Sequence, residues 1–344
     1  MDKFLIIRLS SLGDIIHTLP AFAALRNYFP EAEISWLVQD KGKEILDFVP
    51  GIDRTIVLPQ KKWSITSKYF WSEFLHVVRE ISNKDQIALD FQGLFKSGLF
   101  TYLSKAKTRI GFHKNNLRES GASIFYTSHL DPISEKMHII SKNLKLLTKV
   151  GIQQEKFEFP IQIPEDLSKS VLEKIKILGY REPNRLVILN VGAAWETKRW
   201  FSDRWIELIR ILNKEYLDLF FLILWGTDEE RALAEDIHAQ TNTPITPTLS
   251  LKEVMALIKE ADLLISGDTF ALQIACALSR PVVGLFGPTS PKRNGPFCEQ
   301  DSVAFQEMDC SHCYKRKCSN LECLKKITPK EVAALSLQRL DKHA

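Results

Sequence analysis

The chain has 344 residues, of which 45% are hydrophobic and 26% are charged, and its formal net charge is only +4. This composition is typical of a soluble globular protein, long enough for two domains of roughly 150 residues each. The small net charge gives no support to a nucleic-acid partner, and no apolar run approaches the ~20 residues that a membrane-spanning helix needs.

The N-terminal residues predict a buried strand followed by a polar turn and a helix. Phe4–Leu9 is a β-branched and apolar run, too short for a signal peptide, so we expect a cytoplasmic protein. The run ends at the turn Ser10–Asp14, and Ile15–Phe29 then has helical spacing. Pro20 lies inside that segment and predicts a kink or a break near Leu19.

Strands and helix-like stretches alternate through the rest of the first half, which predicts a doubly wound parallel sheet. Further strands are expected at Ile34–Val38, Thr55–Leu58 and Ile87–Phe91. The two prolines of Phe157–Asp166 place a domain linker there. We therefore expect an N-terminal domain at residues 1–160, a C-terminal domain at 161–328 and a last helix at 329–344, for which packing back on the N-terminal domain is one arrangement.

The stretch Gln60–Trp71 departs from this alternation because it mixes lysines with aromatic residues. One interpretation is a solvated loop that leads into a helix whose aromatic side chains pack on the core. The other is a surface that meets lipid headgroups or an anionic glycolipid, since lysines and amphipathic aromatics suit that interface. The sequence leaves both open.

The second half repeats the same order of elements. Strands are expected at Leu186–Asn190 and Leu219–Trp225, with helices at Asp203–Leu212, Glu229–Gln240 and Leu251–Lys259. Because each half begins with a strand, a glycine-bearing loop and a helix, we predict an α/β protein of two similar domains facing across a cleft.

The most informative part of the second half is a predicted βαβ unit. Leu263–Ile265 and Val282–Phe286 are apolar runs, and the apolar segment Phe270–Leu278 between them has the length of a short helix. Ligands of open α/β sheets bind at the carboxyl ends of such strands, where helix N-termini present free amides. Asp268 and Thr269 fall at one such end, so they either hold a phosphate-bearing ligand or only cap the helix.

Two charged side chains at strand ends are candidates for chemistry. Asp14 follows the first strand, where it either caps the next helix or acts as a general base that the strand end holds rigidly. Lys198 lies between a strand and a helix, where its ammonium either stays on an exposed loop or neutralises a phosphate. Trp195 and Trp200 on either side make a plain solvated loop less expected.

The residues after the most apolar strand give a weaker signal. Asp228 and Glu229 either accept hydrogen bonds from ribose hydroxyls or act as first-turn helix charges. The sequence contains no Walker P-loop and no GxGxxG motif after a strand, which argues against kinases and dinucleotide dehydrogenases.

Four of the six cysteines cluster near the C-terminus with the spacing Cys310-x2-Cys313-x4-Cys318-x4-Cys323. Four thiols suffice for a tetrahedral structural zinc, although the second and third gaps are at the long end of the usual ligand spacing. The competing interpretation is a set of reduced packing cysteines, since a reducing compartment disfavours disulfides. His312 lies inside the cluster and is able to replace one thiol.

These motifs together resemble those of the ADP-heptose:lipopolysaccharide heptosyltransferases of glycosyltransferase family 9. The residues that carry the resemblance are Ser10–Pro20 (SSLGDIIHTLP), Lys198-Arg199-Trp200, Gly267-Asp268-Thr269 and Phe286–Pro291 (FGPTSP). Asp90–Ser97 (DFQGLFKS) and Arg118-Glu119-Ser120 are most similar to heptosyltransferase I of that series. The resemblance spans nearly the whole chain.

The resemblance implies a glycosyltransferase B fold, with the acceptor bound mainly by the first Rossmann-like domain and the nucleotide sugar by the second. It implies an inverting transfer of L-glycero-D-manno-heptose from ADP-heptose to a Kdo sugar of lipid A, with no cofactor required. The implied location is the cytoplasmic face of the inner membrane.

The resemblance also implies roles for single residues. Asp14 matches the general base, and Lys198 matches the lysine on the donor phosphates. The implied donor-binding residues are Ala193, Ala194, Lys198, Glu229, Leu249, Asp268, Thr269, Phe270 and Gln273. The implied acceptor-binding residues are Ser10, Ser11, Gly13, Lys61, Lys62, Gln92 and Arg118.

The sequence departs from the family at two positions of the donor half. Phe270 stands where the family usually has glycine, and its Cβ and ring restrict how closely a phosphate approaches. Gln273 stands where a histidine normally lies, and its amide forms hydrogen bonds but carries no proton charge. Two other functions therefore stand beside the first: a family-9 transferase acting at a later core position, and a nucleotide-sugar-binding protein that has lost activity.

Overall fold

The computed structural model describes residues 2–59, 70–154, 156–298 and 301–341. The chain divides into two compact units, each continuous in sequence: Met1–Gln162 (unit 1) and Ile163–Ala344 (unit 2). The division falls inside Phe157–Asp166, the stretch in which the two prolines place the linker.

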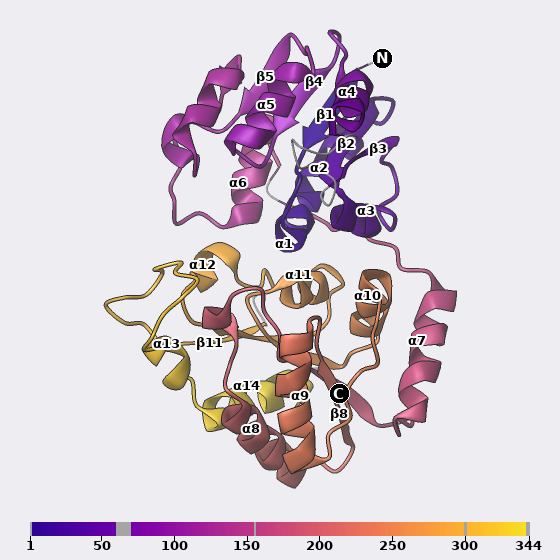
Figure 1. The fold of residues 1–344 in the computed structure, drawn as a ribbon, viewed down its shortest axis with the longest axis vertical. Coiled ribbons are helices and arrows are strands. Elements are labelled where there is room, and N and C mark those ends of the chain that lie inside the picture. The colour runs from indigo at the N-terminus through magenta and orange to yellow at the C-terminus, as the bar shows by residue number, and fades with distance from the viewer. Residues whose placement is uncertain (1, 60–69, 155, 299–300, 342–344) are drawn as a thin grey trace. The chain divides into compact units, whose positions relative to one another are not determined.

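Unit 1 is built around a parallel sheet with the strand order β3-β2-β1-β4-β5-β6 (Figure 1). Its strands are β1 (Lys3–Ile7), β2 (Glu33–Gln39), β3 (Arg54–Leu58), β4 (Ile87–Asp90), β5 (Thr108–Gly111) and β6 (Ser128–His129). Ile7 pairs with Leu37 on one side and with Asp90 on the other. The chain therefore leaves β1 and β4 at the same edge of the sheet, which is where a ligand is expected in this fold class.

The helices of unit 1 follow the predicted pattern, including its interruption. They are α1 (Leu12–Ile16), α2 (Leu19–Tyr28), α3 (Asp40–Leu46), α4 (Phe70–Ile81), α5 (Phe95–Leu103) and α6 (Ile139–Leu146), with the 3-10 turns η1 (Lys114–Asn116), η2 (Ser120–Phe125) and η3 (Leu147–Val150). The break that Pro20 predicts is confirmed, because α1 ends at Ile16 and α2 begins at Leu19. The proline lies in the first turn of α2, where its missing N–H costs no hydrogen bond.

Unit 2 has a second parallel sheet, with the order β11-β10-β9-β7-β8. Its strands are β7 (Arg185–Asn190), β8 (Leu219–Leu224), β9 (Leu263–Gly267), β10 (Val282–Phe286) and β11 (Ser302–Phe305). The strands β9 and β10 enclose α11 (Phe270–Ala277), which confirms the predicted βαβ unit. Asn190 pairs with Ser266 in the register of β7 and β9, so these two strands end together.

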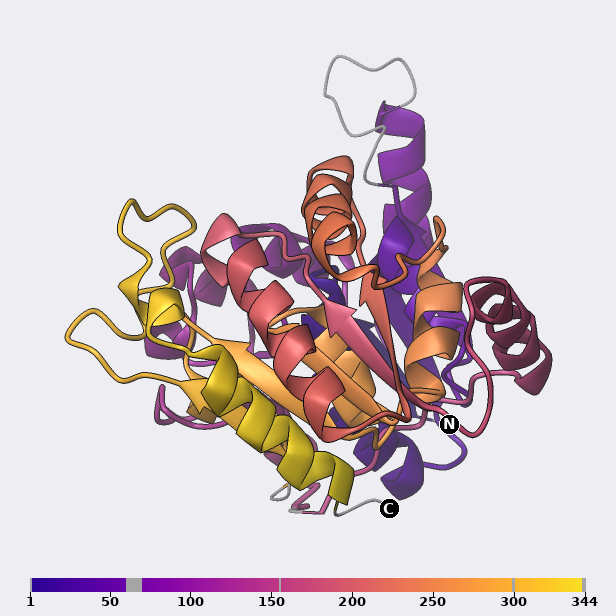
Figure 2. The same cartoon turned by 90° about the horizontal axis from the view of Figure 1, so that it is seen from below.

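The remaining helices of unit 2 cover its sheet. They are α7 (Glu165–Ile177), η4 (Glu196–Lys198), α8 (Ser202–Glu215), α9 (Asp228–Thr241), α10 (Leu251–Lys259), α12 (Pro291–Asn294), α13 (Glu322–Lys325) and α14 (Pro329–Asp341). Helix α14 packs against α8 and against β9, β10 and β11, and the yellow α14 lies beside α8 in both ribbon views (Figures 1 and 2). The last helix therefore packs within unit 2.

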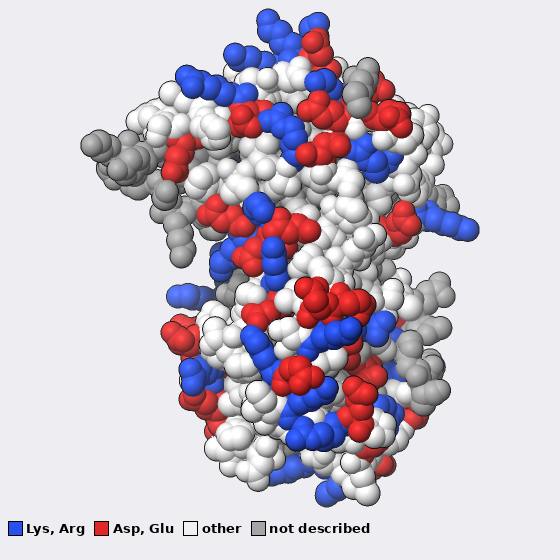
Figure 3. Space-filling view, turned by 90° about the vertical axis from the view of Figure 1, so that its right-hand side faces the viewer, with Lys and Arg blue, Asp and Glu red and all other residues white. Residues whose placement is uncertain are grey.

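Charged side chains of both signs lie close together on one face of each unit. Basic and acidic residues are interspersed over both units on the face shown in Figure 3. Several of them form ion pairs, such as Arg26 with Asp53 and Arg185 with Asp218. Within the described ranges, no helix combines the length and the apolar character needed to cross a membrane.

Candidate active site

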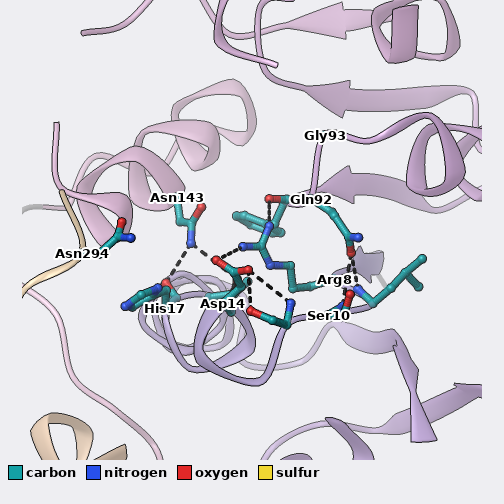
Figure 4. A network of polar contacts seen from close by, with 12 residues as sticks. Arg8, Ser10, Asp14, His17, Gln92, Gly93, Asn143 and Asn294 are labelled. Atoms are coloured by element: carbon teal, nitrogen blue, oxygen red, sulfur yellow. Dashed lines mark hydrogen bonds and ion pairs between the residues drawn. The ribbon is translucent and has the colours of Figure 1, made fainter. Parts of the chain in front are cut away.

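The turn after β1 brings a buried arginine to the carboxylate of Asp14 (Figure 4). Arg8 directly follows the strand and is only 5% exposed. Its guanidinium lies 2.9 Å from Asp14 Oδ1 and also donates to the carbonyl of Phe91. The second oxygen, Asp14 Oδ2, accepts hydrogen bonds from the backbone N–H and the hydroxyl of Ser11 at 3.2 and 2.8 Å. One oxygen of Asp14 thus closes the first turn of α1, and the other is held by Arg8.

Asp14 is ionised and accessible. Burial raises the pKa of Asp14, but the guanidinium of Arg8, the imidazole of His17 and the hydrogen bonds from Ser11 outweigh burial and lower the pKa to about 2. The side chain is still 40% exposed. This edge of unit 1 therefore presents a rigidly held anionic carboxylate to a ligand at every physiological pH.

A second set of hydrogen bonds ties this turn to the end of β4. Gln92 Oε1 accepts from the backbone N–H groups of Leu9 and Ser10 at 2.7 and 3.3 Å (Figure 4). The turn that carries Gln92 is itself held by Asp90, whose Oδ1 accepts from the N–H groups of Gln92 and Gly93 at 2.8 and 3.1 Å. The amide oxygen of Gln92 therefore positions the turn before α1, a role that the sequence did not suggest.

The other residues expected on the acceptor side differ in exposure. Ser10 is half-buried and Ser11 is exposed in the turn before α1, and Gly13 is half-buried in the first turn of that helix. Arg118 is exposed on the connection between η1 and η2. Lys61 and Lys62 lie outside the described residues, as does most of the lysine and aromatic stretch Gln60–Trp71.

In unit 2, two of the charges predicted at strand ends form an ion pair that is nearly buried. Lys198 Nζ lies 2.7 Å from Asp268 Oδ2 and donates to the backbone carbonyl of Asp268 at 3.0 Å. The side chains of Lys198 and Asp268 are 15% and 8% exposed. The ammonium also lies 4.5 Å from the ring centroid of Trp195, a cation–π contact that fixes its direction. The fold thus joins residues that lie 70 positions apart in the sequence.

Gly267 permits this approach because it has no side chain. A Cβ atom at this position would lie 2.7 Å from the backbone oxygen of Lys198, which is closer than non-bonded atoms come. Any other residue would push the lysine loop away from the end of β9. The glycine of the Gly-Asp-Thr motif is therefore required for the distance between Lys198 and Asp268.

The hydroxyl of Thr269 is used inside the site and does not cap α11. Asn190 Nδ2 donates to Thr269 Oγ1 at 3.1 Å and to Ser266 Oγ at 2.8 Å. The two hydroxyls lie 3.0 Å apart. The alternative in which Thr269 only caps the helix is therefore not what the structure shows. The first backbone N–H groups of α11 donate no hydrogen bond to the Thr269 side chain.

A buried glutamate that the sequence analysis missed lies at the start of α9. Glu230 is buried, and its carboxylate accepts from the N–H groups of Gly226 and Thr227 at 2.8 and 3.1 Å. The Thr-x-x-Glu spacing is the capping-box signal that identifies such a glutamate, but the sequence analysis considered only its neighbours. Glu230 therefore shapes the loop after β8.

The predicted ribose contact, Glu229, is the exposed member of this acidic pair. Its side chain is 79% exposed and lies 3.2 Å from Arg199 Nη1. Arg199 in turn donates from Nε to the carbonyl of Ala193 at 2.8 Å, which joins Glu229 to the loop after β7. Among the other residues expected on the donor side, Ala194 is exposed and Leu249 is half-buried just before α10.

The two departures from the family pattern lie on α11. Gln273 is 2% exposed, and its Nε2 donates to the carbonyl of Asn294 at 2.8 Å. This bond ties α11 to the end of α12. Phe270 is half-buried at the first position of the helix. Gln273 is thus part of the internal structure of unit 2, and Phe270 is the departure that lies closer to Asp268.

The clustered cysteines line one cavity of about 70 Å³, together with Thr197 and Pro288. All four thiols are free; Cys310, Cys313 and Cys318 are exposed and Cys323 is half-buried. His312 does not take the place of a thiol, because its ring stacks on Phe305 with the ring centroids 5.5 Å apart. Across the described residues, no group of three or more His, Cys, Asp or Glu side chains is already placed to hold a metal ion.

Comparison with known proteins assigns this geometry to a family. A family model described as glycosyltransferase family 9 (heptosyltransferase) matches residues 75–324. The chain belongs to glycosyltransferase family 9. It is 30% identical over 305 residues to lipopolysaccharide heptosyltransferase 1 of Campylobacter coli, covering 85% of this chain and 86% of that protein. It is 26% identical over 324 residues to the protein of the same name in Pseudomonas aeruginosa, covering 92% and 87%.

More distant relatives include proteins of another name. Lipopolysaccharide heptosyltransferase 3 of Escherichia coli is 23% identical over 283 residues, covering 80% of this chain and 81% of that protein. Among solved structures, E. coli heptosyltransferase WaaC with ADP has a TM-score of 0.78 at 22% identity, covering 99% of this chain and 100% of that one. The family 9 glycosyltransferase of Veillonella parvula has a TM-score of 0.82 at 21% identity, covering 99% and 97%.

These findings confirm three predictions made from the motifs. The chain is a family 9 glycosyltransferase, it is therefore an enzyme of that class, and its fold is the glycosyltransferase B type of its structural neighbours. The family and its named relatives support a heptosyltransferase of lipopolysaccharide core biosynthesis.

Proposed function

We propose that this family 9 enzyme is an inverting heptosyltransferase that moves L-glycero-D-manno-heptose from ADP-heptose to a Kdo sugar of lipid A. The observation that supports the proposal is that each unit places charged side chains at the carboxyl edge of its sheet. Unit 1 offers the anionic carboxylate of Asp14, and unit 2 offers Lys198 on Asp268 beside the amides of α11. A base and a phosphate site are the two parts that such a transfer needs.

On the acceptor side, Asp14 takes the proton of the Kdo hydroxyl. The acceptor oxygen forms a bond to the anomeric carbon of heptose while the bond from that carbon to the diphosphate breaks, and the electron pair leaves with ADP. A carboxylate with a pKa of about 2 is a weak base toward a free hydroxyl. It suffices late in the reaction, because the hydroxyl proton becomes strongly acidic once its oxygen bonds to the anomeric carbon.

On the donor side, positive charge is needed where the diphosphate leaves. Lys198 supplies an ammonium, and the first amides of α11 supply N–H donors and the positive end of the helix dipole. Asp268 holds the ammonium in place at 2.7 Å and has a second oxygen for a sugar hydroxyl. We propose that these groups suffice without a divalent cofactor, and that Glu229 accepts from the ribose.

The acceptor requires access to a lipid surface. We propose that the enzyme works at the cytoplasmic face of the inner membrane, with no nucleic-acid partner, and that Lys61, Lys62 and Arg118 meet acidic groups of the acceptor. The exposure of Arg118 supports its part of this proposal.

The direct test incubates the protein with ADP-heptose and Kdo-lipid A. We expect ADP release and a glycolipid heavier by one heptose, in the presence of EDTA as well as in its absence. The Asp14→Asn variant is the matched control, because it keeps the shape of the site but lacks the base. ADP release without a heavier glycolipid would show hydrolysis, and no reaction with this acceptor would refute the Kdo step.

A second candidate is a family 9 transfer to a later position of the core. The observations that favour it are the substitutions at Phe270 and Gln273 and the relatives named heptosyltransferase 3. Offering a heptosylated core in the same assay separates the two, since only one acceptor should gain a sugar. Binding of ADP-heptose without transfer to either acceptor would support the inactive binding protein.

A further inference from the structure

The segment between β11 and α13 is stabilised by few interactions. Residues 306–321 contain no helix or strand, and none of them is buried. Three of its non-glycine residues, His312, Tyr314 and Leu321, have left-handed backbone conformations with φ of 61°, 51° and 51°. Because the segment buries no apolar side chain, it gains little to offset the conformational entropy lost on ordering. A few hydrogen bonds anchor the segment at Tyr314 and Lys315, and a cross-link would fix the rest of it.

The four cysteines of this region supply the groups for such a cross-link. Cys310, Cys313, Cys318 and Cys323 all line the same cavity of about 70 Å³. Metal ions bind the thiolate form of cysteine. His312 is stacked on Phe305, so the four thiols and the carboxylate of Glu322 are the cavity-lining groups able to bind a metal ion, and zinc prefers the thiolates.

We propose that Cys310, Cys313, Cys318 and Cys323 bind one Zn²⁺ ion as a tetrathiolate site that fixes residues 306–321. Zinc prefers four tetrahedral ligands, with Zn–S distances of roughly 2.3 Å. The four sulfurs are not drawn together around one point in the structure, but three of the four side chains are exposed and therefore turn without displacing packed neighbours. Binding replaces the S–H bonds by Zn–S bonds and releases the thiol protons to solvent.

The zinc segment lies against the loops that carry the proposed donor site. Thr197, which precedes Lys198, donates from Oγ1 to the carbonyl of Lys315 at 2.8 Å. The N–H of Tyr314 donates to the carbonyl of Pro288 at 3.0 Å. Arg316 lies 5.1 Å from the ring centroid of Trp195, the ring that also contacts Lys198. These contacts are made by residues between Cys313 and Cys318. A metal ion bound by the two cysteines would therefore fix the residues that contact the Lys198 loop.

Cys323, the fourth proposed ligand, lies close to the Phe286–Pro291 loop. A Cβ atom at Gly287 would lie 3.2 Å from the sulfur of Cys323 and 2.8 Å from Leu324 Cδ2. The glycine after β10 therefore leaves room for the cysteine segment. The metal site and the Phe286–Pro291 loop are packed as one structure within unit 2.

The first experiment measures metal in the full chain, purified without chelators. Elemental analysis should give close to one zinc per chain. Cys313→Ser should lose it, whereas Cys298→Ser should keep it, because Cys298 is also exposed in unit 2 but does not line the cavity. Cobalt added to zinc-free protein should give the intense thiolate-to-metal charge-transfer absorption of a tetrathiolate site.

The proposal would be overturned by less than about a tenth of a metal ion per chain in protein with reduced thiols, or by equal zinc in the Cys313→Ser and parent proteins. A disulfide among the four cysteines in protein prepared under reducing conditions would also overturn it. Because Cys313→Ser could fail to fold, Cys318→His provides a second variant. It keeps four ligands, so it should retain zinc and shift the cobalt spectrum.

A second experiment tests the link to the donor loops and rests on the proposed function. Hydrogen exchange should be faster in residues 306–321 and in the Lys198 loop after zinc removal, and the ADP affinity should fall by severalfold. If zinc binds but ADP does not bind even to the zinc-loaded protein, the proposed donor site is wrong and the metal site stands. Unchanged exchange in both segments would refute the supporting role of zinc.

Discussion

Arg8 and Asp14 form an ion pair of 2.9 Å in which the two partners differ in exposure. The side chain of Arg8 is 6% exposed, and that of Asp14 is 40% exposed. The cation is thus fixed inside unit 1, where it also donates to the carbonyl of Phe91, while the carboxylate reaches the surface. Such an arrangement keeps Asp14 ionised and oriented without hiding it from a ligand, which is the requirement for a base that acts on a bound hydroxyl.

Asp14→Asn should abolish turnover and leave ADP binding near normal. The amide keeps the size of the carboxylate but accepts no proton from the acceptor, and loss of a general base typically costs about 10²–10⁴-fold in rate. Steady-state kinetics and calorimetric titration of ADP measure the two effects. Asp85→Asn is the matched control, since Asp85 is an 85% exposed carboxylate of the same unit. Parent-like turnover of Asp14→Asn would remove this residue from the mechanism.

Arg8→Gln should move the acid limb of the pH profile upward. Asp14 has a lowered pKa, so its charged form persists until the pH falls to about 2. Without the guanidinium the burial that raises the pKa is less opposed, and protonation at a higher pH then removes the base. The logarithm of kcat/KM against pH should therefore begin to fall at a higher pH in the variant, while Arg8→Lys should resemble the parent. If the pH profile of Arg8→Gln matched that of the parent, Arg8 would not be what lowers the pKa of Asp14.

Lys198→Met should weaken ADP binding and also destabilise unit 2. The methionine removes the ammonium proposed for the diphosphate and leaves Asp268, which is 8% exposed, without its cation. We expect at least a tenfold loss in ADP affinity, or about 1.4 kcal/mol. The double variant Lys198→Met/Asp268→Asn should recover thermal stability but not affinity. Recovery of both properties would mean that the lysine serves structure alone.

Phe270→Gly should lower stability and change ADP affinity only modestly. The ring is half-buried at the first position of α11, so its removal loses packing and adds chain entropy, together about 1 kcal/mol or more. Urea unfolding and ADP titration measure the two quantities. If the ring instead blocks the phosphate site, the glycine should raise ADP affinity by tenfold or more, and the placement of the ring would be wrong.

Arg339→Leu should destabilise the protein more at pH 8 than at pH 5. Burial raises the pKa of Asp301 to about 6, although Arg339, 2.9 Å away, lowers it. Because the folded state favours protonated Asp301, stability falls as the pH rises through about 6, and it falls further when the arginine is absent. Removing one partner of a buried pair costs about 3–5 kcal/mol when the other stays charged.

Urea unfolding at the two pH values checks this expectation. The variant Arg339→Leu/Asp301→Asn serves as the control, because it has no buried charge and should show a much smaller dependence on pH. Equal destabilisation by Arg339→Leu at pH 5 and pH 8 would contradict the role assigned to the ionisation of Asp301.

Hydrophobic patterning was sufficient to predict the central strands of both sheets. β1 and β9 are short apolar runs that are buried on both faces and end at polar turns. This pattern is typical of the inner strands of a parallel sheet. The short strands β5 and β6 were not predicted, because Thr108 and Arg109 in β5 and both residues of β6 are polar and leave no apolar run. Pro20 predicted a helix boundary because its ring acts locally, through the backbone alone.

The site was predicted less completely, because its partners come from distant parts of the chain. Asp14 and Lys198 could be chosen from their positions at strand ends. In the sequence, Arg8 is only a single charged residue within an apolar run. A buried charge needs a partner, and the sequence does not show which residue that partner is. Gln92 is expected to meet the acceptor, and in the structure its amide oxygen accepts from the N–H groups of Leu9 and Ser10. These hydrogen bonds depend on the pairing of β1 with β4, whose register the sequence does not give.

The position of α14 has a consequence for the order in which the protein is made. Unit 1 is one uninterrupted segment, so all the strands of its sheet are synthesised before any strand of unit 2. In unit 2, by contrast, α8 and the strands β9–β11 pack against residues 329–341. Newly synthesised unit 2 therefore keeps an apolar surface uncovered until its last helix has left the ribosome. Aggregation during synthesis is therefore a greater hazard for that half of the chain than for unit 1.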